Sequence, residues 1–123
     1  MLHFFMNKGI KDDIYYWSEL NKVLNLYCQL KKICPELDSL NIGGGFPIKH
    51  SLGFDYDYKY MVNEIISNIK SVCKRNKVDV PDIYTEFGSY TVGESGAVIY
   101  STLGEKMQND REIWYMIDSS FIT

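Results

Sequence analysis

Apolar residues follow two patterns along the chain: short continuous runs, and longer stretches with helical spacing. The short runs at residues 2–6, 39–42 and 82–86 have the length of buried strands. Two longer stretches lie between them, and each places its apolar side chains on one helix face: Leu20, Val23, Leu24, Tyr27 and Leu30, then Met61, Ile65, Ile69 and Val72, with Val62, Ile66 and Cys73 broadening the second stripe. Strands that alternate with such helices predict βαβ units and a parallel sheet.

Both predicted helices have recognisable ends. Asp12 or Asp13 is placed to cap the first helix, and Asp57 is placed to open the second. The first helix is expected to stop at Cys34, because Pro35 disfavours the helical conformation in the residue before it.

The pattern changes after Gly88. Residues 97–103 and 113–117 are rich in β-forming side chains and are separated by a polar turn around residues 108–110. This predicts an antiparallel β region, with a domain boundary near residues 90–95. An eight-stranded β/α barrel takes about 250 residues, so the units before the boundary amount to only part of one. The predicted fold class is therefore α/β, a partial (β/α)8 TIM barrel made of the last β-α units and running into an antiparallel β domain, and we expect a longer protein.

Composition and charge exclude several classes of function. Hydrophobic residues make up 46% and charged residues 24% of the 123 residues, which is ordinary for a soluble globular domain. The net charge is −3 and the basic residues are scattered, so nucleic acid is not an expected partner. No apolar run approaches the roughly 20 residues of a membrane span. Cys28, Cys34 and Cys73 show no C-x-x-C spacing, which predicts buried thiols in a reducing cytoplasm rather than disulfides or a metal site.

Three consecutive glycines, Gly43, Gly44 and Gly45, follow the second predicted strand. A backbone without Cβ atoms can turn tightly and direct several N–H groups at one anion, and phosphate groups commonly bind at this face of β/α barrels. The alternative is that the glycines only make a turn. The dinucleotide pattern G-x-G-x-x-G is not met, because Pro47 and Ile48 occupy the later positions.

Glu86 ends the third predicted strand, so it is expected on the same rim as the glycines. Taken alone, such a residue is a surface or ion-pair carboxylate. Facing a pyridine nitrogen, it would keep that nitrogen protonated, because an opposite charge favours the charged form. A protonated pyridinium is the electron sink of pyridoxal phosphate. Gly88 would again let the backbone approach a ligand.

These residues resemble a family of pyridoxal-phosphate-dependent decarboxylases with the alanine-racemase-like barrel, which includes ornithine, diaminopimelate and biosynthetic arginine decarboxylases. The resemblance is carried by LNIGGGFP at residues 40–47 and TEFGS at residues 85–89. Within that family the chain is most similar to the biosynthetic arginine decarboxylases, on the segments CPELD at 34–38, GESGA at 93–97 and WYMIDSSF at 114–121. The resemblance implies domains at 1–92, the C-terminal part of the cofactor-binding barrel, and at 93–123, the start of the β domain.

The resemblance also implies roles for single residues. Gly43, Gly44 and Gly45 would bind the phosphate of pyridoxal 5′-phosphate through backbone N–H groups, Glu86 would face the pyridine nitrogen, and Gly88 would pack beside the phosphate. The usual arginine after that glycine is Ser89 here, and a hydroxyl brings one hydrogen-bond donor but no charge. No metal is implied.

The first strand departs from the family pattern as well. Phe5 stands where a histidine usually stacks on the cofactor ring, and Lys8 stands where a serine is usual. His3 is then expected to face the other way as a structural residue. Lys8 and Lys49 could help to neutralise a phosphate, or could be ordinary solvated lysines.

The resemblance implies a cytoplasmic enzyme, a homodimer or higher homo-oligomer, that decarboxylates arginine to agmatine and carbon dioxide in polyamine and spermidine biosynthesis. The family's Schiff-base lysine, cysteine and aspartate have no counterpart among these 123 residues, so no catalytic residue is assigned and the chain alone is expected to be inactive. Alternatives are decarboxylation of diaminopimelate, ornithine or carboxynorspermidine, a non-catalytic relative that serves as a binding module, and a non-functional remnant.

Overall fold

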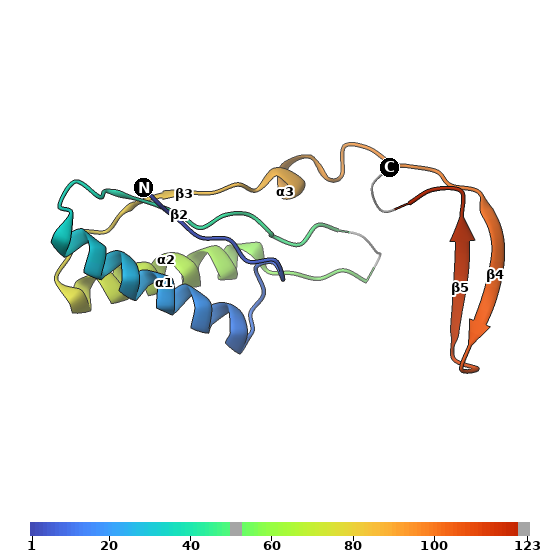
Figure 1. Ribbon diagram of the computed structural model, residues 1–123, viewed down its shortest axis with the longest axis horizontal. Helices are drawn as coiled ribbons and strands as arrows, with labels where there is room; N and C mark the ends of the chain where they lie inside the picture. The colour runs from blue at the N-terminus through green and yellow to red at the C-terminus, as the bar shows by residue number, and fades with distance from the viewer. Residues whose placement is uncertain (50–52, 121–123) are drawn as a thin grey trace.

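The computed structural model of the protein describes residues 1–49 and 53–120. Three short strands alternate with two long helices, and a short helix then leads to a hairpin (Figure 1). The elements are β1 (Leu2–His3), α1 (Ile14–Ile33), β2 (Ser39–Asn41), α2 (Tyr58–Asn76), β3 (Asp82–Tyr84), α3 (Gly88–Val92), β4 (Thr102–Gln108) and β5 (Glu112–Ile117). The predicted mixed α/β class is confirmed, and closure into a barrel stays a prediction.

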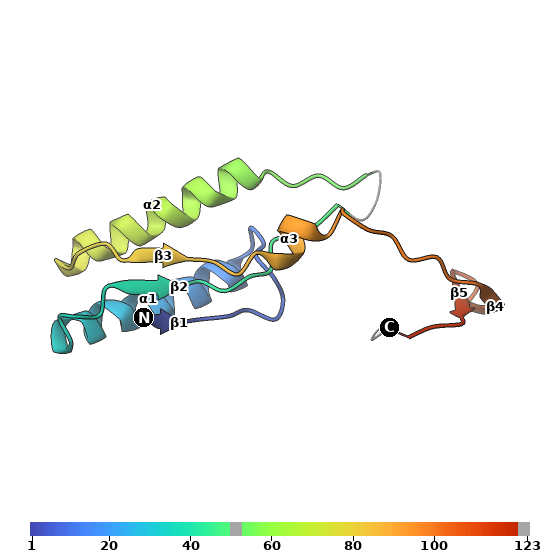
Figure 2. The same ribbon diagram turned by 90° about the horizontal axis from the view of Figure 1, so that it is seen from above.

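The first three strands form a parallel sheet in the order β1-β2-β3, as predicted. Helices α1 and α2 cover one face of this sheet and leave the other face open, and the carboxyl ends of all three strands point the same way (Figures 1 and 2). The strands end earlier than predicted, at His3, Asn41 and Tyr84 instead of residues 6, 42 and 86. The backbone beyond turns into loops that the apolar pattern does not distinguish from strand.

The helix ends match their predicted caps. Asp13 Oδ1 accepts the N–H of Tyr16 at 2.7 Å, and the side chain of Asp57 accepts the N–H of Tyr60 at 2.8 Å. Of the two candidates for the first cap, Asp13 takes that role, while Asp12 accepts from the ring N–H of Trp17 at 2.6 Å. The first helix ends at Ile33 with Cys34 as its C-cap, so the effect predicted for Pro35 is confirmed.

The core lies between the two long helices and the covered face of the sheet. The predicted inward faces are confirmed by the buried side chains, except that Val62 is 37% exposed and Val23, Leu30 and Ile66 are only partly buried. The buried apolar residues are Met6, Ile10, Tyr16, Leu20, Leu24, Tyr27, Cys28, Leu40, Ile42, Phe46, Met61, Ile65, Ile69, Val72 and Cys73. Within the described ranges, no helix is both long enough and apolar enough to span a membrane.

Two of the three cysteines lie in this core. Cys28 on α1 and Cys73 on α2 are free, buried and in side-chain contact, and burial raises the pKa of the Cys73 thiol to about 11. Cys34 is exposed, so the prediction of a buried thiol is wrong there. The physical reason is its position at the C-cap, where the chain leaves the helix and turns away from the core.

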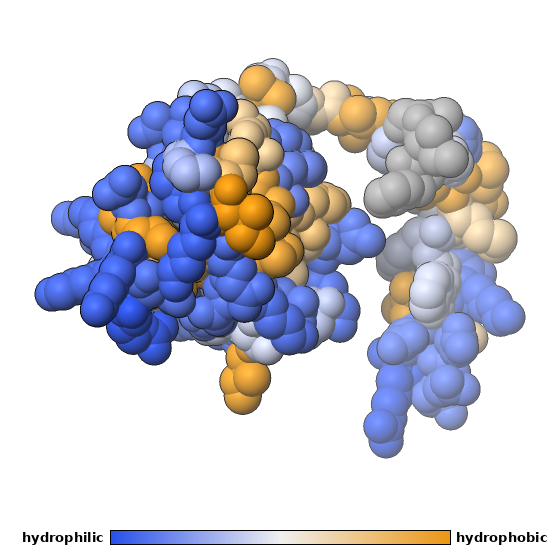
Figure 3. All heavy atoms as spheres, turned by 60° about the vertical axis from the view of Figure 1, so that its left-hand side comes forward, coloured by the Kyte–Doolittle hydropathy of each residue, from blue (hydrophilic) through white to orange (hydrophobic). Residues whose placement is uncertain are grey.

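The antiparallel region is a single hairpin of β4 and β5, set apart from the helices in Figure 1. Its turn is where the sequence predicted it, with positive φ at Asn109 and Asp110. The bounds of the strand predicted at 97–103 are wrong, because the observed strand runs from Thr102 to Gln108. It pairs with β5 from Thr102 opposite Ile117 to Gln108 opposite Glu112. Apolar side chains of the hairpin stay exposed, and Figure 3 shows them as patches beside polar ends.

Helix α3 was not predicted from the sequence. It has five residues and no side-chain cap at its N-terminus, so neither periodicity nor capping marks it. The predicted division at residues 92 and 93, where this helix ends, stays a prediction, and residues 121–123 of the second predicted domain lie outside the described part.

Packing between α1 and the sheet predicts a large difference between two leucines of the same helix. Leu24 is fully buried and Leu26 is 46% exposed. Leu24→Ala should lower the free energy of unfolding by about 2–5 kcal/mol because it leaves a cavity. Leu26→Ala should lower it by less than about 1 kcal/mol. Urea unfolding of both variants measures this, and equal losses would contradict the burial of Leu24.

The cysteine environments predict one fast thiol and two slow ones. With a small aromatic disulfide reagent at mildly alkaline pH, Cys34 should react promptly because its thiol is exposed. Cys28 and Cys73 should react only as the protein unfolds, since burial raises both thiol pKa values. The time course of thiol release with and without denaturant tests this, with Cys34→Ser removing the fast phase.

Candidate functional site

The carboxyl edge of the sheet brings three loops together. The Ile42 N–H donates to the Tyr84 carbonyl at 3.0 Å, and the Glu86 N–H donates to the Gly43 carbonyl at 2.8 Å. The Ile10 N–H donates to the Gly45 carbonyl at 2.8 Å. These backbone bonds hold the glycine loop between the segments that follow β1 and β3, as the parallel sheet predicts.

Gly43 and Gly44 are buried where their neighbours leave no room for a side chain. Gly43 has φ +69°, and a Cβ there would lie 2.7 Å from the Phe4 carbonyl oxygen. A Cβ on Gly44 would overlap the Glu86 carbonyl oxygen. Glycine is therefore required at two consecutive positions, Gly43 and Gly44, whereas an ordinary surface turn needs it at one position at most.

Gly45 makes a further close approach, to a residue that was not predicted from the sequence. A Cβ on Gly45 would lie 2.9 Å from Gly9 Cα, and one on Gly9 would lie 2.8 Å from the Gly45 carbonyl oxygen. Gly9 follows Lys8 in the first loop. A glycine shortly after a strand, in the loop facing a glycine-rich one, is the signal that could have identified it.

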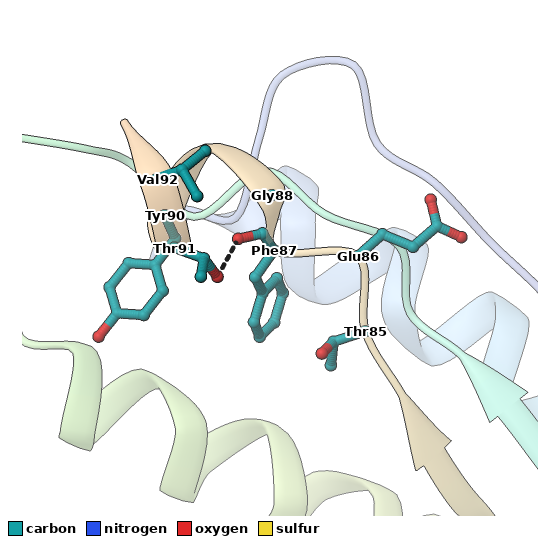
Figure 4. A pocket seen from close by; sticks show the side chains of 7 residues that line it. All are labelled: Thr85, Glu86, Phe87, Gly88, Tyr90, Thr91 and Val92. Atoms are coloured by element: carbon teal, nitrogen blue, oxygen red, sulfur yellow. Dashed lines mark hydrogen bonds between the residues drawn. The ribbon is translucent and has the colours of Figure 1, made fainter. Parts of the chain in front are cut away.

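The Glu86 carboxylate lies on the open face of the sheet, and its side chain is 56% exposed. Asn41 Nδ2 donates to Glu86 Oε1 at 2.7 Å, and His3 Nε2 lies 3.5 Å from the same oxygen. The Oδ1 atom of Asn41 accepts the Gly43 N–H at 2.8 Å. Figure 4 shows Glu86 directed away from its neighbours Thr85 and Phe87, so the carboxylate is turned from the α2 side.

The expectation that His3 faces the other way is wrong, because its imidazole lies beside Glu86. Side chains alternate along a strand, so His3 and Phe5, two residues apart, share one face. The same alternation places Asn41 on that face between the buried Leu40 and Ile42. Asn41 was missed and His3 was assigned to the wrong face, although period-two alternation could have placed both side chains on the open face.

The remaining predicted site residues lie around this edge. Phe5 is 55% exposed, and its ring atom Cδ2 would be 3.1 Å from a Cβ on Gly43, so the ring borders the glycine turn. Gly88 donates its N–H to the Glu86 carbonyl at 2.9 Å and has open space where its Cβ would be. Ser89 follows it as an exposed residue of α3. The structure thus brings Phe5, the glycines and Glu86 together and leaves Ser89 at the margin.

An open hollow lies beside this edge, lined by Thr85, Glu86, Phe87, Gly88, Tyr90, Thr91 and Val92 (Figure 4). Its short helix is fixed by Thr91, whose Oγ1 donates to the Phe87 carbonyl at 2.8 Å. The hollow is therefore lined by one continuous segment, which runs from the end of β3 through α3 and includes Glu86.

A cluster of five aromatic side chains packs beneath the loops of this edge: Phe46, Tyr56, Tyr58, Phe87 and Tyr90. Phe46 and Phe87 have ring centroids 4.4 Å apart, and Tyr58 and Tyr90 have centroids 4.8 Å apart. Tyr58 donates its hydroxyl to the Pro47 carbonyl at 2.6 Å, and Tyr56 donates to the Ile10 carbonyl at 2.9 Å. Burial, and secondly the neighbouring Tyr58, raise the pKa of Tyr56 to about 12, which keeps it a neutral donor.

The arrangement offers two chemical functions within one short edge. A glycine turn, exposed at Gly45, borders an uncovered surface, and a held carboxylate stands beside it. A carboxylate can pair with a cationic N–H group, and glycine backbone can approach an anionic group closely. A ligand with both groups matches this edge.

The comparison with protein families matches most of the chain to a known family. The family described as pyridoxal-dependent decarboxylase, pyridoxal binding domain, matches residues 2–93. That range includes β1, β2, β3 and the whole edge described above, from Phe5 to Ser89.

Relatives and solved structures agree with this match. The biosynthetic arginine decarboxylase of a Prochlorococcus marinus strain is 24% identical over 111 residues, which cover 85% of this chain and 17% of that protein. The crystal structure of the biosynthetic arginine decarboxylase from Campylobacter jejuni matches with TM-score 0.62 and 26% identity, over 72% of this chain and 16% of that one. Diaminopimelate decarboxylase from M. jannaschi matches in fold, with TM-score 0.65 and 24% identity over 95% of this chain and 26% of that one.

The glycine contacts predict unequal effects of two alanine substitutions. Gly44→Ala should cost about 1–3 kcal/mol of stability, because its Cβ meets the Glu86 backbone and displaces the end of β3. Gly88→Ala should change stability by no more than about 0.5 kcal/mol, since its Cβ enters open space. Denaturant unfolding compares the two variants. A harmless Gly44→Ala would show that the loop does not lie against Glu86.

Proposed function

The chain belongs to the pyridoxal-dependent decarboxylase family, and from this premise we propose that its carboxyl edge binds pyridoxal 5′-phosphate. Gly43, Gly44 and Gly45 would cradle the phosphate, and Glu86 would face the pyridine nitrogen. The observation that carries the proposal is the direct link between these groups, in which the Glu86 N–H donates to the Gly43 carbonyl at 2.8 Å.

The residues present fit the cofactor on two counts. The glycines let the turn pack tightly against the Phe4 and Glu86 backbone, and Gly45 at its end is exposed, where a ligand can approach the backbone. The Glu86 carboxylate is exposed on the open face and held at one oxygen. The Gly43 N–H already donates to Asn41 within the chain. Gly43 would therefore shape the turn without donating to the phosphate. The N–H groups that bind the phosphate would come from the residues after it.

Two departures from the family pattern affect how tightly the cofactor is held. Ser89 supplies a hydroxyl in place of a charged group, and Phe5 supplies an apolar ring in place of an imidazole. Hydrogen bonds to phosphate from charged donors are about twice as strong as neutral ones, so Ser89 should give weaker phosphate binding than arginine would. Phe5 borders the glycine turn, where its ring can stack but cannot donate a proton.

In the proposed reaction, bound pyridoxal phosphate supplies an electron sink for the charge left on an amino acid when its carboxyl group departs. Glu86 keeps the ring nitrogen protonated, because an adjacent negative charge favours the cationic form. Asn41 and His3 hold the carboxylate in place. The glycine turn, joined to the β3 side through the Phe46–Phe87 contact, would hold the phosphate group at the same edge as Glu86.

For the substrate we propose arginine, which would be decarboxylated to agmatine and carbon dioxide as a step toward polyamines, in the cytoplasm and in a homodimer. The support is that P. marinus and C. jejuni proteins similar to this chain are biosynthetic arginine decarboxylases. The chain spans 17% of the length of the P. marinus relative, so activity and substrate are proposed for the whole protein. We propose further that the parallel sheet is part of a (β/α)8 barrel and that the hairpin begins a β domain.

Two alternatives have a specific observation behind them. The fold likeness to diaminopimelate decarboxylase is compatible with another decarboxylase of the family, acting on diaminopimelate, ornithine or carboxynorspermidine. A product assay over these amino acids separates them from arginine. The replacements at Ser89 and Phe5 favour a non-catalytic binding module, and absorbance of bound cofactor in the whole protein would argue against that function.

Glu86 is the residue whose replacement tests the proposal. In the whole protein, Glu86→Ala should slow decarboxylation by about 100-fold or more, since charge stabilisation at the reacting centre is lost. Affinity for pyridoxal phosphate should fall much less, because the glycine turn still holds the phosphate. Turnover and cofactor binding measured side by side at saturating pyridoxal phosphate check this, and Ser89→Ala is the comparison variant expected to weaken binding more than turnover. Near-normal turnover of Glu86→Ala would overturn the role of Glu86.

A further inference from the structure

We propose that Asn41 is a positioning residue, which sets the Glu86 carboxylate and the Gly43 turn in a single arrangement for a ligand with an anionic group and a cationic ring N–H. The inference rests on the proposed function and deepens it, since it says how the two halves of the site are held in register with each other.

Asn41 lies on the open face of the sheet, at the carboxyl end of its middle strand. It is the last residue of β2, the middle strand, and pairs with His3 on β1 and with Tyr84 on β3. Its neighbours Leu40 and Ile42 point into the core. Asparagine is depleted from strands, so a polar amide at this position has a cost in strand propensity that its contacts offset.

The side-chain amide of Asn41 makes one hydrogen bond with its oxygen and one with its nitrogen. Oδ1 accepts the N–H of Gly43 at 2.8 Å, and Nδ2 donates to Glu86 Oε1 at 2.7 Å. The two atoms belong to one planar group, so rotation that improves one contact breaks the other. The conformation of the glycine turn and the direction of the carboxylate are thereby coupled.

The geometry at Glu86 leaves one oxygen for a ligand. Asn41 and His3 both approach Oε1, at 2.7 Å and 3.5 Å. A carboxylate has a second acceptor oxygen, Oε2, which can accept from a ring N–H while Oε1 stays held. Because 2.7 Å is hydrogen-bond distance and the 3.5 Å separation of His3 Nε2 is longer than a good hydrogen bond, the Asn41 contact is the one that orients the carboxylate.

Two substitutions separate positioning from simple turn formation. Asn41→Asp keeps an oxygen for the Gly43 N–H but replaces the Nδ2 donor with an oxygen that repels Glu86. Asn41→Ala removes both contacts. Asn25 supplies the matched control, because its Nδ2 donates to the Asn21 carbonyl on α1 at 2.8 Å. Asn25→Asp and Asn25→Ala apply the same chemical changes away from the edge of the sheet.

The first measurement needs no ligand. In NMR spectra of the ¹⁵N-labelled protein, the Gly43 amide signal should move in Asn41→Ala and stay near its original position in Asn41→Asp. The side-chain amide signals of Asn41 should move in Glu86→Ala. The Asn25 variants should leave all of these signals unchanged, and thermal unfolding checks that each variant is folded. An unmoved Gly43 signal in Asn41→Ala would overturn the proposal, whatever the protein binds.

The second measurement uses pyridoxal 5′-phosphate and inorganic phosphate as separate probes. Asn41→Asp should bind pyridoxal phosphate about tenfold more weakly or worse, with phosphate affinity within about twofold of the original protein. Asn41→Ala should weaken both. Unchanged pyridoxal phosphate affinity in Asn41→Asp would overturn the positioning role. If the unaltered protein bound no pyridoxal phosphate, the proposed function would fail instead, while the NMR result would still decide whether Asn41 couples Gly43 to Glu86.

Discussion

The contact between the glycine turn and the Glu86 backbone is the constraint on which the rest of the carboxyl edge depends. The Glu86 N–H donates to the Gly43 carbonyl, and Gly44 lies directly against the Glu86 carbonyl. Two loops can approach this closely only where one of them has no side chain. The loop after β2 and the loop after β3 are therefore held against each other as a single unit.

The surrounding structure keeps that contact in place from two sides. The aromatic cluster joins Phe46, just after the glycines, to Phe87, just after Glu86, with ring centroids 4.4 Å apart. On the opposite side, Gly45 meets Gly9 and accepts the Ile10 N–H. Tyr56 then ties Ile10 to the segment before α2. The edge is thus anchored to the core through apolar and backbone contacts, and its polar groups are left to face the open side.

The sequence predicted the parts of the fold that depend on interactions between residues near one another in the chain. The same holds for the candidate site, where the residues recognised from the sequence are those with a local signal. Both long helices, their aspartate caps and the stop before Pro35 follow from interactions within a few residues, whereas α3 has neither apolar periodicity nor a capping side chain. The glycines and Glu86 were singled out as candidates because their residue types are distinctive next to a strand end. Asn41 was not, since its contact with Glu86 spans 45 positions of sequence, and local alternation indicates only the face on which its side chain lies. His3 was assigned to the wrong face, although its spacing of two from Phe5 places both side chains on the same side of an extended strand.

That alternation also explains why a core and a polar site can share strands of only two or three residues. Leu40 and Ile42 point toward the helices, and Asn41 between them points to the open face with His3 and Glu86. Each strand contributes residues to both faces, so a shift of one residue in register would exchange the two sets. Burial of Leu40 and Ile42 therefore fixes the side on which Asn41 emerges. Through Asn41, the same hydrophobic packing determines where the Glu86 carboxylate stands.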